Sequence, residues 1–235
     1  MTGRPVRAFE RAARCAALFV CIAVSLAGAD LQAASGTPVD RMLLAAVQKG
    51  DAKAVRAVLA AGASPDMRDS SGTPLVLLAT HANRVEIARL LVAAGADVNA
   101  RDRIEDSAFL YAGAEGRNDI LKLILASGKA DLGSTNRYGG TALIPAAHHG
   151  HVETVRILLA TPIDRNHVNR LGWTALLEAV ILGDGGRAHT EIVRLLVEAG
   201  ADVTIADRDG ATPLAHARRR GYGAMTRILE KAAGR

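Results

Sequence analysis

Three histidines, His148, His149 and His151, lie within four residues and are the side chains best suited to metal chemistry. A closed zinc site needs four converging ligands, and neither Asp nor Cys lies beside these histidines. On a helix, the consecutive His148 and His149 point about 100 degrees apart, so they cannot readily bind one ion together. We therefore expect no metal ion, and we expect the His151 ring to support the helix that follows it.

A second possible ligand set consists of His81, Glu115 and His149, which are spaced by 34 residues. If the chain repeats with that spacing, the three residues occupy one column of a helix stack. Stacked helices lie about 8 to 10 Å apart, whereas each ligand lies about 2 Å from a bound metal ion. The column therefore cannot share one ion, and we expect no cofactor.

The sequence offers little for covalent catalysis or phosphate binding. It contains no Gly-x-Ser-x-Gly motif, and Cys15 and Cys21 lie in an apolar segment near the start. The glycine-rich run at 183–188 lacks the Lys-Ser/Thr ending and the preceding strand of a phosphate-binding loop. We interpret this run as a lengthened turn between two helices that could also serve as a contact, and we predict that the protein is not an enzyme.

A repeated motif organises the elements that carry these residues. A Thr-Pro/Ala-Leu tripeptide, or its Ser-Ala-Phe counterpart, begins at Thr73, Ser107, Thr141, Thr174 and Thr212. The steps are 34, 34, 33 and 38 residues. A second apolar run with helical spacing follows in each unit and ends in Gly-Ala-Asp after 85–91 and 191–196. This period indicates units of helix, tight turn, helix and extended loop, which bury their apolar faces against their neighbours.

These motifs, together with Ala-Ala-His-His-Gly-His-Val-Glu at 146–153, resemble the ankyrin repeat, whose period is about 33 residues. The resemblance covers residues 38–233. It implies an all-α fold, an ankyrin-repeat solenoid of about six helix-turn-helix units joined by β-hairpin-like finger loops. The expected units are 38–68, 69–101, 102–135, 136–168, 169–206 and 207–233, with the first and last acting as caps.

The chain departs from the family pattern in several places. The His that should follow Thr-Pro-Leu is absent from every unit, so packing must hold the first helices. Unit three has Asp-Ser-Ala-Phe at 106–109 where Gly-x-Thr-Pro-Leu is expected, and unit four has Pro-Ile-Asp at 162–164 instead of Gly-Ala-Asp. We expect local irregularity in these two units and the same overall fold.

The first 29 residues are typical of a secretory signal peptide. Residues 1–14 contain four Arg and one Glu, and a 15-residue apolar run follows and ends in Ala-Gly-Ala at 27–29. We therefore predict a cleaved signal peptide at 1–29, a short linker at 30–37 and the ankyrin-repeat domain at 38–233. The alternative is an uncleaved anchor, although the run is shorter than the about 20 residues of a membrane span.

Cleavage would change the charge and the redox chemistry of the chain. The whole sequence has 29 basic and 24 acidic residues, a net charge of +5, and the loss of four Arg and one Glu lowers this charge to +2. The mature chain would contain no cysteine, which suits an oxidising compartment. Without a broad basic excess, and with aromatic residues at 3%, the composition argues against nucleic-acid binding.

The finger loops carry the residues best suited to binding a partner. Asp or Asn at each tip supports a tight turn through its own side chain, whereas the Arg column beside it is less expected from turn chemistry. Trp, Tyr and Arg most often dominate interface energies. We predict partner-binding residues at Tyr111, Tyr138, Trp173, Arg103, Arg137, Arg170 and Arg208. The alternatives are that the Arg column is a solvated edge and that Trp173 covers the base of a finger.

The resemblance implies a non-catalytic protein–protein interaction module, and the leader places it in the periplasm of a bacterium or outside the cell. We expect a monomer whose partner is another protein, an acidic one if the Arg column takes part. We expect no binding to nucleic acid and, after cleavage, none to membranes. Two alternatives stay open, an accessory protein in oxidative-stress defence that associates with a catalase and a secreted effector that binds a host protein.

Overall fold

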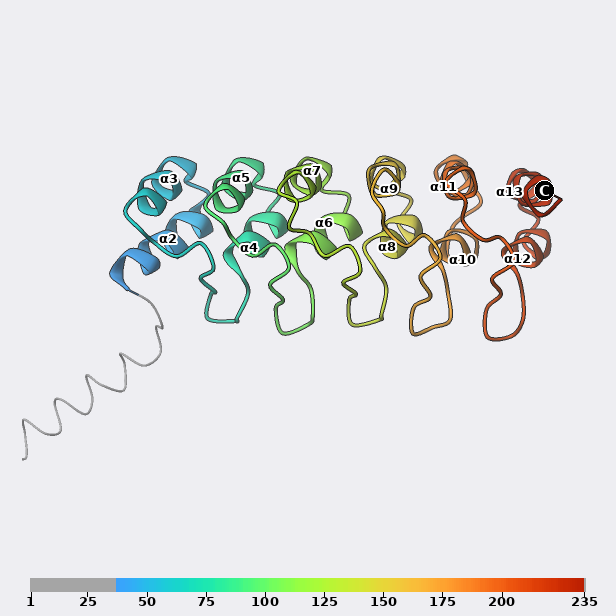
Figure 1. Ribbon diagram of the computed structural model, residues 1–235, viewed down its shortest axis with the longest axis horizontal. Coiled ribbons are helices and arrows are strands. Elements are labelled where there is room, and N and C mark those ends of the chain that lie inside the picture. Colours follow the sequence, from blue (N-terminus) through green and yellow to red (C-terminus); the bar gives the residue numbers. More distant parts are fainter. Residues whose placement is uncertain (1–36, 235) are drawn as a thin grey trace, which may run out of the picture.

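A computed structural model describes residues 37–234, and these residues form two parallel rows of helices in an elongated stack (Figure 1). The inner row consists of α2 (Pro38–Lys49), α4 (Leu75–His81), α6 (Ala108–Ala114), α8 (Leu143–His148), α10 (Ala175–Ile181) and α12 (Pro213–Arg219). The outer row consists of α3 (Ala52–Ala60), α5 (Val85–Ala93), α7 (Asn118–Ala126), α9 (Val152–Leu159), α11 (Arg187–Glu198) and α13 (Gly223–Ala233). Each helix packs against its partner within the unit and against the same helix of the next unit. The predicted all-α solenoid is confirmed.

The units are joined by fingers, which project beyond the inner row (Figure 1). We number each finger after the unit that it opens, and their tips span 69–73, 102–106, 136–140, 169–173 and 207–211. In every tip the first residue's N–H donates to the carbonyl of the fifth, and the fifth residue's N–H donates to the side chain of the first. The leading Asp or Asn thus holds the turn, as predicted. Within 37–234 the fingers contain no strand, only an isolated bridge between Arg68 and Pro74.

The helix caps correct the repeat register of unit two. Ser107, Thr174 and Thr212 are the N-caps of α6, α10 and α12, and each side chain accepts a hydrogen bond from the first turn. In α4 the N-cap is Pro74, so Pro74 and not Thr73 is equivalent to Ser107. The first step of the repeat is therefore 33 residues. The Thr-Pro-Leu tripeptide of this unit is displaced by one residue relative to the others.

Units three and four each show a local irregularity, although that of unit four lies at Pro145 and not at the predicted 162–164. Glu105 has a φ of +66° at the finger position where Gly139 and Gly172 have φ of +73° and +87°, so a non-glycine residue adopts the left-handed conformation there. In α8, Pro145 cannot donate the N–H that would bond the Thr141 carbonyl. The Ile144 N–H bonds that carbonyl instead at 3.1 Å, and α8 begins at Leu143.

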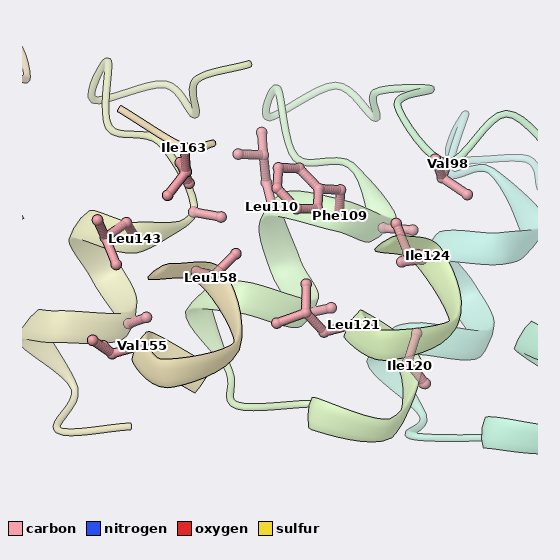
Figure 2. Packing of buried hydrophobic residues seen from close by; sticks show 14 of the residues in the cluster. Val98, Phe109, Leu110, Ile120, Leu121, Ile124, Leu143, Val155, Leu158 and Ile163 are labelled. Carbon is pink, nitrogen blue, oxygen red and sulfur yellow. The ribbon is translucent and has the colours of Figure 1, made fainter. Parts of the chain in front are cut away.

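The core runs between the two helix rows. Phe109 of α6 is fully buried in the slot that Leu143 and Leu176 fill in units four and five, as predicted, and Leu158 of α9 and Ile163 are buried in the same cluster (Figure 2). Ile163 replaces the small Ala of the Gly-Ala-Asp motif and still points into the core. None of the helices within 37–234 combines the length and the apolar character needed to cross a membrane.

Candidate functional site

A cavity of about 530 Å³ opens on the inner face of units three to five. Its walls come from α6, α8 and α10 and from fingers three, four and five. We call it the central cavity. Because it combines exposed apolar side chains with buried ionisable ones, it is the candidate functional site.

The rim of the central cavity is apolar and belongs to the middle of the stack only. Ile104, Tyr138 and Leu171 occupy the third position of fingers three, four and five, and they are 51%, 55% and 48% exposed. The same position in fingers two and six holds Ser71 and Asp209. The three apolar residues of the middle fingers and Leu182 at the end of α10 are four of the six large apolar side chains that are exposed in the described part of the chain. Clustered exposed apolar groups of this kind mark binding surfaces.

Glu178 of α10 lies in the wall of the central cavity and is only 6% exposed. Its Oε1 accepts a hydrogen bond of 2.8 Å from the Asn169 amide in finger five. Its Oε2 lies 3.7 Å from Nδ1 of His148, too far for a hydrogen bond, and no hydrogen bond within residues 37–234 reaches it. Burial raises the pKa of Glu178 to about 7, although Asn169 and His149 lower it.

His148 of α8 faces this carboxyl group. Burial lowers the pKa of His148, and the nearby His149 and His189 lower it further. Since the pKa of Glu178 is raised and that of His148 is lowered, the two groups do not form a strong ion pair near pH 7. The wall of the cavity therefore keeps a carboxyl group without a cationic partner.

The other charged residues of the central cavity are mostly acidic. Asp106 in finger three is half-buried, and burial, followed by the charge of Asp102, raises its pKa. Glu115 is exposed at the edge of the cavity. Arg137 is the one cation other than His on the cavity wall in the described part, and its guanidinium lies 4.9 Å from the centre of the Tyr138 ring. The cavity wall thus holds three carboxyl groups and one guanidinium, and the charge of Arg137 lowers the pKa of Asp106.

The structure brings together some of the predicted binding residues. Tyr111, Tyr138 and Arg137 line the central cavity, and the Tyr111 ring lies 4.2 Å from the ring of His81. Trp173 does not line it. The Trp173 backbone closes the base of finger five through two hydrogen bonds with Asn169.

The remaining arginines lie along the fingers, outside the cavity wall. Arg170 donates to the carbonyl of Arg137 at 2.7 Å, and Arg208 donates to the carbonyl of Arg170. Arg103 packs across Gly72 of the preceding finger, as Arg170 and Arg208 pack across Gly139 and Gly172. The Arg column therefore connects successive fingers. A guanidinium has five N–H donors, so these exposed side chains keep further donors for a partner.

The structure changes the expected positions of two sets of residues, the column of His81, Glu115 and His149 and the histidine cluster at 148–151. His81 is equivalent to His148, because unit two is shifted by one residue, so His81, Glu115 and His149 do not form one column. His151 is the N-cap residue of α9, but its side chain makes no capping hydrogen bond, and its ring lies against Gly116 of the preceding unit. Within 37–234 no group of three or more His, Cys, Asp or Glu is placed to hold a metal ion. The absence of a metal stays a prediction.

Residues 183–186 of the glycine-rich run lie in the connection between α10 and α11, as predicted, and residues 187–188 begin α11. Asp184 bonds the Gly186 N–H at 2.8 Å and His189 Nδ1 at 2.9 Å. The Tyr222 hydroxyl donates to the Gly183 carbonyl at 3.0 Å, and its ring covers Gly185. The lengthened turn is thus held by the next unit.

The apolar third position of the fingers was not singled out in the sequence. A comparison of the five finger tips shows the change from Ser71 and Asp209 at the ends to Ile104, Tyr138 and Leu171 in the middle, so the signal was present. The burial of Glu178 has no comparable signal. It depends on how close α8 and finger five approach α10.

Comparison with protein families identifies the repeat. A model of ankyrin repeats in three copies matches residues 12–102 and 108–207, and the first match begins within the predicted leader. Among curated proteins, the chain is similar to the putative ankyrin repeat protein YahD of Escherichia coli K12, with 46% identity over 102 residues. That match covers 43% of this chain and 51% of YahD, so the chain spans about half the length of this relative.

Solved structures give longer matches. An ankyrin repeat domain from Acinetobacter baumannii AYE is 52% identical with a TM-score of 0.79, over 81% of this chain and 97% of that one. The ankyrin repeat protein EF0377 is 41% identical with a TM-score of 0.79, over 82% and 98%. The ankyrin repeat domain of Bcl-3, a member of the IkappaB family, is 29% identical with a TM-score of 0.73, over 84% and 86%.

Proposed function

Because the chain belongs to the ankyrin-repeat family, we propose that it is a non-catalytic interaction module whose protein partner binds in the central cavity. Proteins of this family are generally scaffolds without enzymatic activity that bind other proteins. One observation carries the proposal for this surface. The third finger position is apolar in the three central fingers and polar in the two outer ones, as seen in Ile104, Tyr138 and Leu171 against Ser71 and Asp209.

The partner would contact two neighbouring surfaces, the apolar rim of the central cavity and the Arg column of the fingers. Tyr138 and Leu171 supply exposed apolar area that a partner would bury as anchors. Arg103, Arg170 and Arg208 along the fingers would orient an acidic part of the partner and speed its association. In this proposal the protein is a monomer.

Affinity capture from a periplasmic extract tests the proposal. Replacement of Tyr138 and Leu171 together by Ala should weaken binding of the captured partner by about 2 kcal/mol or more, which is about 30-fold. Val168→Ala is the matched control, because Val168 is 45% exposed but lies outside the cavity wall. Equal binding by the double variant and the control, with unchanged circular dichroism, would remove the central cavity as the binding site.

Export to the periplasm is a separate part of the proposal, and it concerns residues outside 37–234. The basic segment, the apolar run and Ala-Gly-Ala at 27–29 support cleavage before Asp30. Amino-terminal sequencing of the protein from a fractionated bacterium should read from Asp30. Retention of Met1 in the membrane pellet would contradict cleavage.

The two alternative roles make different predictions about the same strain. A secreted effector would accumulate in the growth medium. An accessory protein of a catalase would leave a deletion strain more sensitive to peroxide. A periplasmic interaction module of another pathway would do neither.

A further inference from the structure

We propose that the central cavity recognises a basic side chain of the partner, a Lys or Arg flanked by apolar residues, and that Glu178 receives its charged group. The proposal rests on the proposed function and adds the chemistry that the cavity selects. It assigns the apolar rim to the flanking residues. It assigns the carboxyl group in the wall to the basic side chain.

The position of Glu178 carries the first step. Its carboxyl group is more than nine-tenths buried, and one oxygen is held by Asn169 while the other has no hydrogen bond within residues 37–234. This second oxygen is not among the fully buried polar atoms that lack a partner in the described residues, so it is open to the cavity, where a charge-assisted hydrogen bond from a cation can reach it. A partner's ammonium or guanidinium group supplies both a donor and a positive charge.

Unit six has its own pair of polar side chains at the position that Asn169 and Glu178 occupy in unit five. Asp207 and His216 are nine residues apart and stand in unit six where Asn169 and Glu178 stand in unit five. There the His216 Nε2 lies 2.6 Å from Asp207 Oδ2, and both side chains are buried. Unit six therefore closes this position with its own pair of complementary groups. Unit five leaves an acid in the wall of a cavity, open to an external cation.

The charges around Glu178 agree with a cationic occupant. Asp106 and Glu115 add carboxyl groups to the same cavity, while the guanidinium of Arg137 lies against Tyr138. His148 at the end of α8 faces Glu178, and the next residue, His149, lies close enough to lower the pKa of Glu178. Protonation of His148 would repel a cation.

The other helices packed against α10 carry titratable groups that already have partners. His189 of α11 contacts Asp184 and the His148 carbonyl, and His216 of α12 contacts Asp207. A pH effect on binding therefore arises mainly at Glu178 and His148. Both favour cation binding at higher pH, because the carboxyl group ionises and the His148 imidazole is neutral there.

Binding should strengthen as pH rises through the range in which Glu178 ionises. With a pKa of about 7, the ionised fraction of Glu178 increases about tenfold from pH 6 to pH 8. A peptide that requires the ionised carboxylate should thus bind about tenfold more tightly at pH 8 than at pH 6.

Selection from a random 12-residue peptide library displayed on phage tests the inference without a known partner. The wild-type protein should enrich peptides with a Lys or Arg between apolar residues. Glu178→Gln, which keeps the shape and the Asn169 contact, should enrich the apolar residues without the basic one. Enrichment of peptides that lack a basic residue, or an equal preference for it in Glu178→Gln, would overturn the inference and leave the proposed function intact.

The same selection separates the two proposals. If the wild-type protein enriches no peptide beyond the folded Tyr138→Ala and Leu171→Ala double variant, the central cavity is not a peptide-binding site. The proposed function then fails, and the inference about Glu178 fails with it.

A selected peptide is then synthesised and titrated at pH 6 and pH 8. The wild-type protein should show the tenfold change, and Glu178→Gln should bind at least about tenfold more weakly at pH 8 with little pH dependence. Glu153→Gln is the matched control, since Glu153 is an exposed Glu on the outer helix α9. An equal pH dependence in wild type and Glu178→Gln would overturn the assignment of the cation to Glu178.

Discussion

At the scale of single residues, ionisation of the buried Glu178 carboxyl group lowers the stability of the folded protein, and the same carboxylate is the proposed cation-binding group. Its carboxyl group is buried beside a His that is not a strong ion-pair partner near neutral pH. A raised pKa in the folded state means that the folded protein holds the proton more tightly than the unfolded chain does. The stability that this proton provides is complete below the ordinary Glu pKa of about 4.5 and is lost as pH rises through about 7.

Glu178→Gln should therefore stabilise the protein at high pH and leave it nearly unchanged at low pH. The shift from 4.5 to about 7 corresponds to about 3 kcal/mol at pH 8. Urea unfolding at pH 5 and pH 8 measures the difference, with Glu153→Gln as the exposed control. A constant difference between wild type and Glu178→Gln at both pH values would show that Glu178 is ionised throughout.

At the scale of elements, side chains of one unit bond the carbonyl ends of helices in the unit before it. Arg84 donates to the Val47 and Gln48 carbonyls at the end of α2, and His149 contacts the Ala114 carbonyl of α6 at 2.8 Å. Tyr222 does the same for Gly183 after α10. The last carbonyls of a helix lack partners within the helix, so these contacts stabilise the inner row unit by unit.

Tyr222 also fixes the lengthened turn, and a glycine pair tests this contact. Gly185 and Gly210 have φ of +72° and +77°. A Cβ on Gly185 would lie 2.5 Å from the Tyr222 ring, whereas a Cβ on Gly210 would meet nothing within 4 Å. Gly210→Ala should cost about 1 to 2 kcal/mol from backbone strain alone. Gly185→Ala should cost about 1 to 3 kcal/mol more, because the added methyl group overpacks the turn.

The excess cost should disappear in a Tyr222→Ala background. A thermodynamic cycle of Gly185→Ala and Tyr222→Ala, measured by urea unfolding, isolates the contact. If Gly185→Ala and Gly210→Ala destabilise the protein equally, Tyr222 does not hold the turn.

The helices were largely predictable because the sequence features that define the repeat act over a few residues. Apolar spacing, the N-cap Thr and the closing Gly each act within a few residues, and together they located the helix pairs. The misplaced register of unit two has a local cause as well. Thr73-Pro74-Leu75 reads like the motif of the other units, but Pro74 takes the N-cap position and Thr73 belongs to the finger.

The candidate site was only partly predictable, because it forms from contacts between units. Tyr111 and Tyr138 were expected from their residue type and their place on the inner face. The cross-finger contacts of Arg170 and Arg208 depend on the distance between neighbouring fingers. The buried position of Glu178 depends on α8, α10 and finger five together. No spacing within one unit encodes those distances.

At the scale of the whole molecule, the stack has contacts mainly between neighbouring units. Leu158 of α9 is fully buried in unit four, near the middle of the chain (Figure 2). Leu158→Ala should cost about 2 to 5 kcal/mol, because it removes apolar contacts and leaves a cavity. Since the interfaces of unit four connect the two ends, their loss should uncouple units one to three from units five and six.

Uncoupling can be observed because the chain has one Trp, Trp173, which lies in unit five. In urea, circular dichroism reports all helices and Trp173 fluorescence reports the carboxyl-terminal units, so the two transitions of Leu158→Ala should separate. Leu229→Ala is the matched control, because Leu229 of α13 is equally buried but lies in the terminal unit, where its loss does not divide the stack. Coincident transitions with an unchanged midpoint in Leu158→Ala would contradict nearest-neighbour coupling and would mean that the six units unfold as one body.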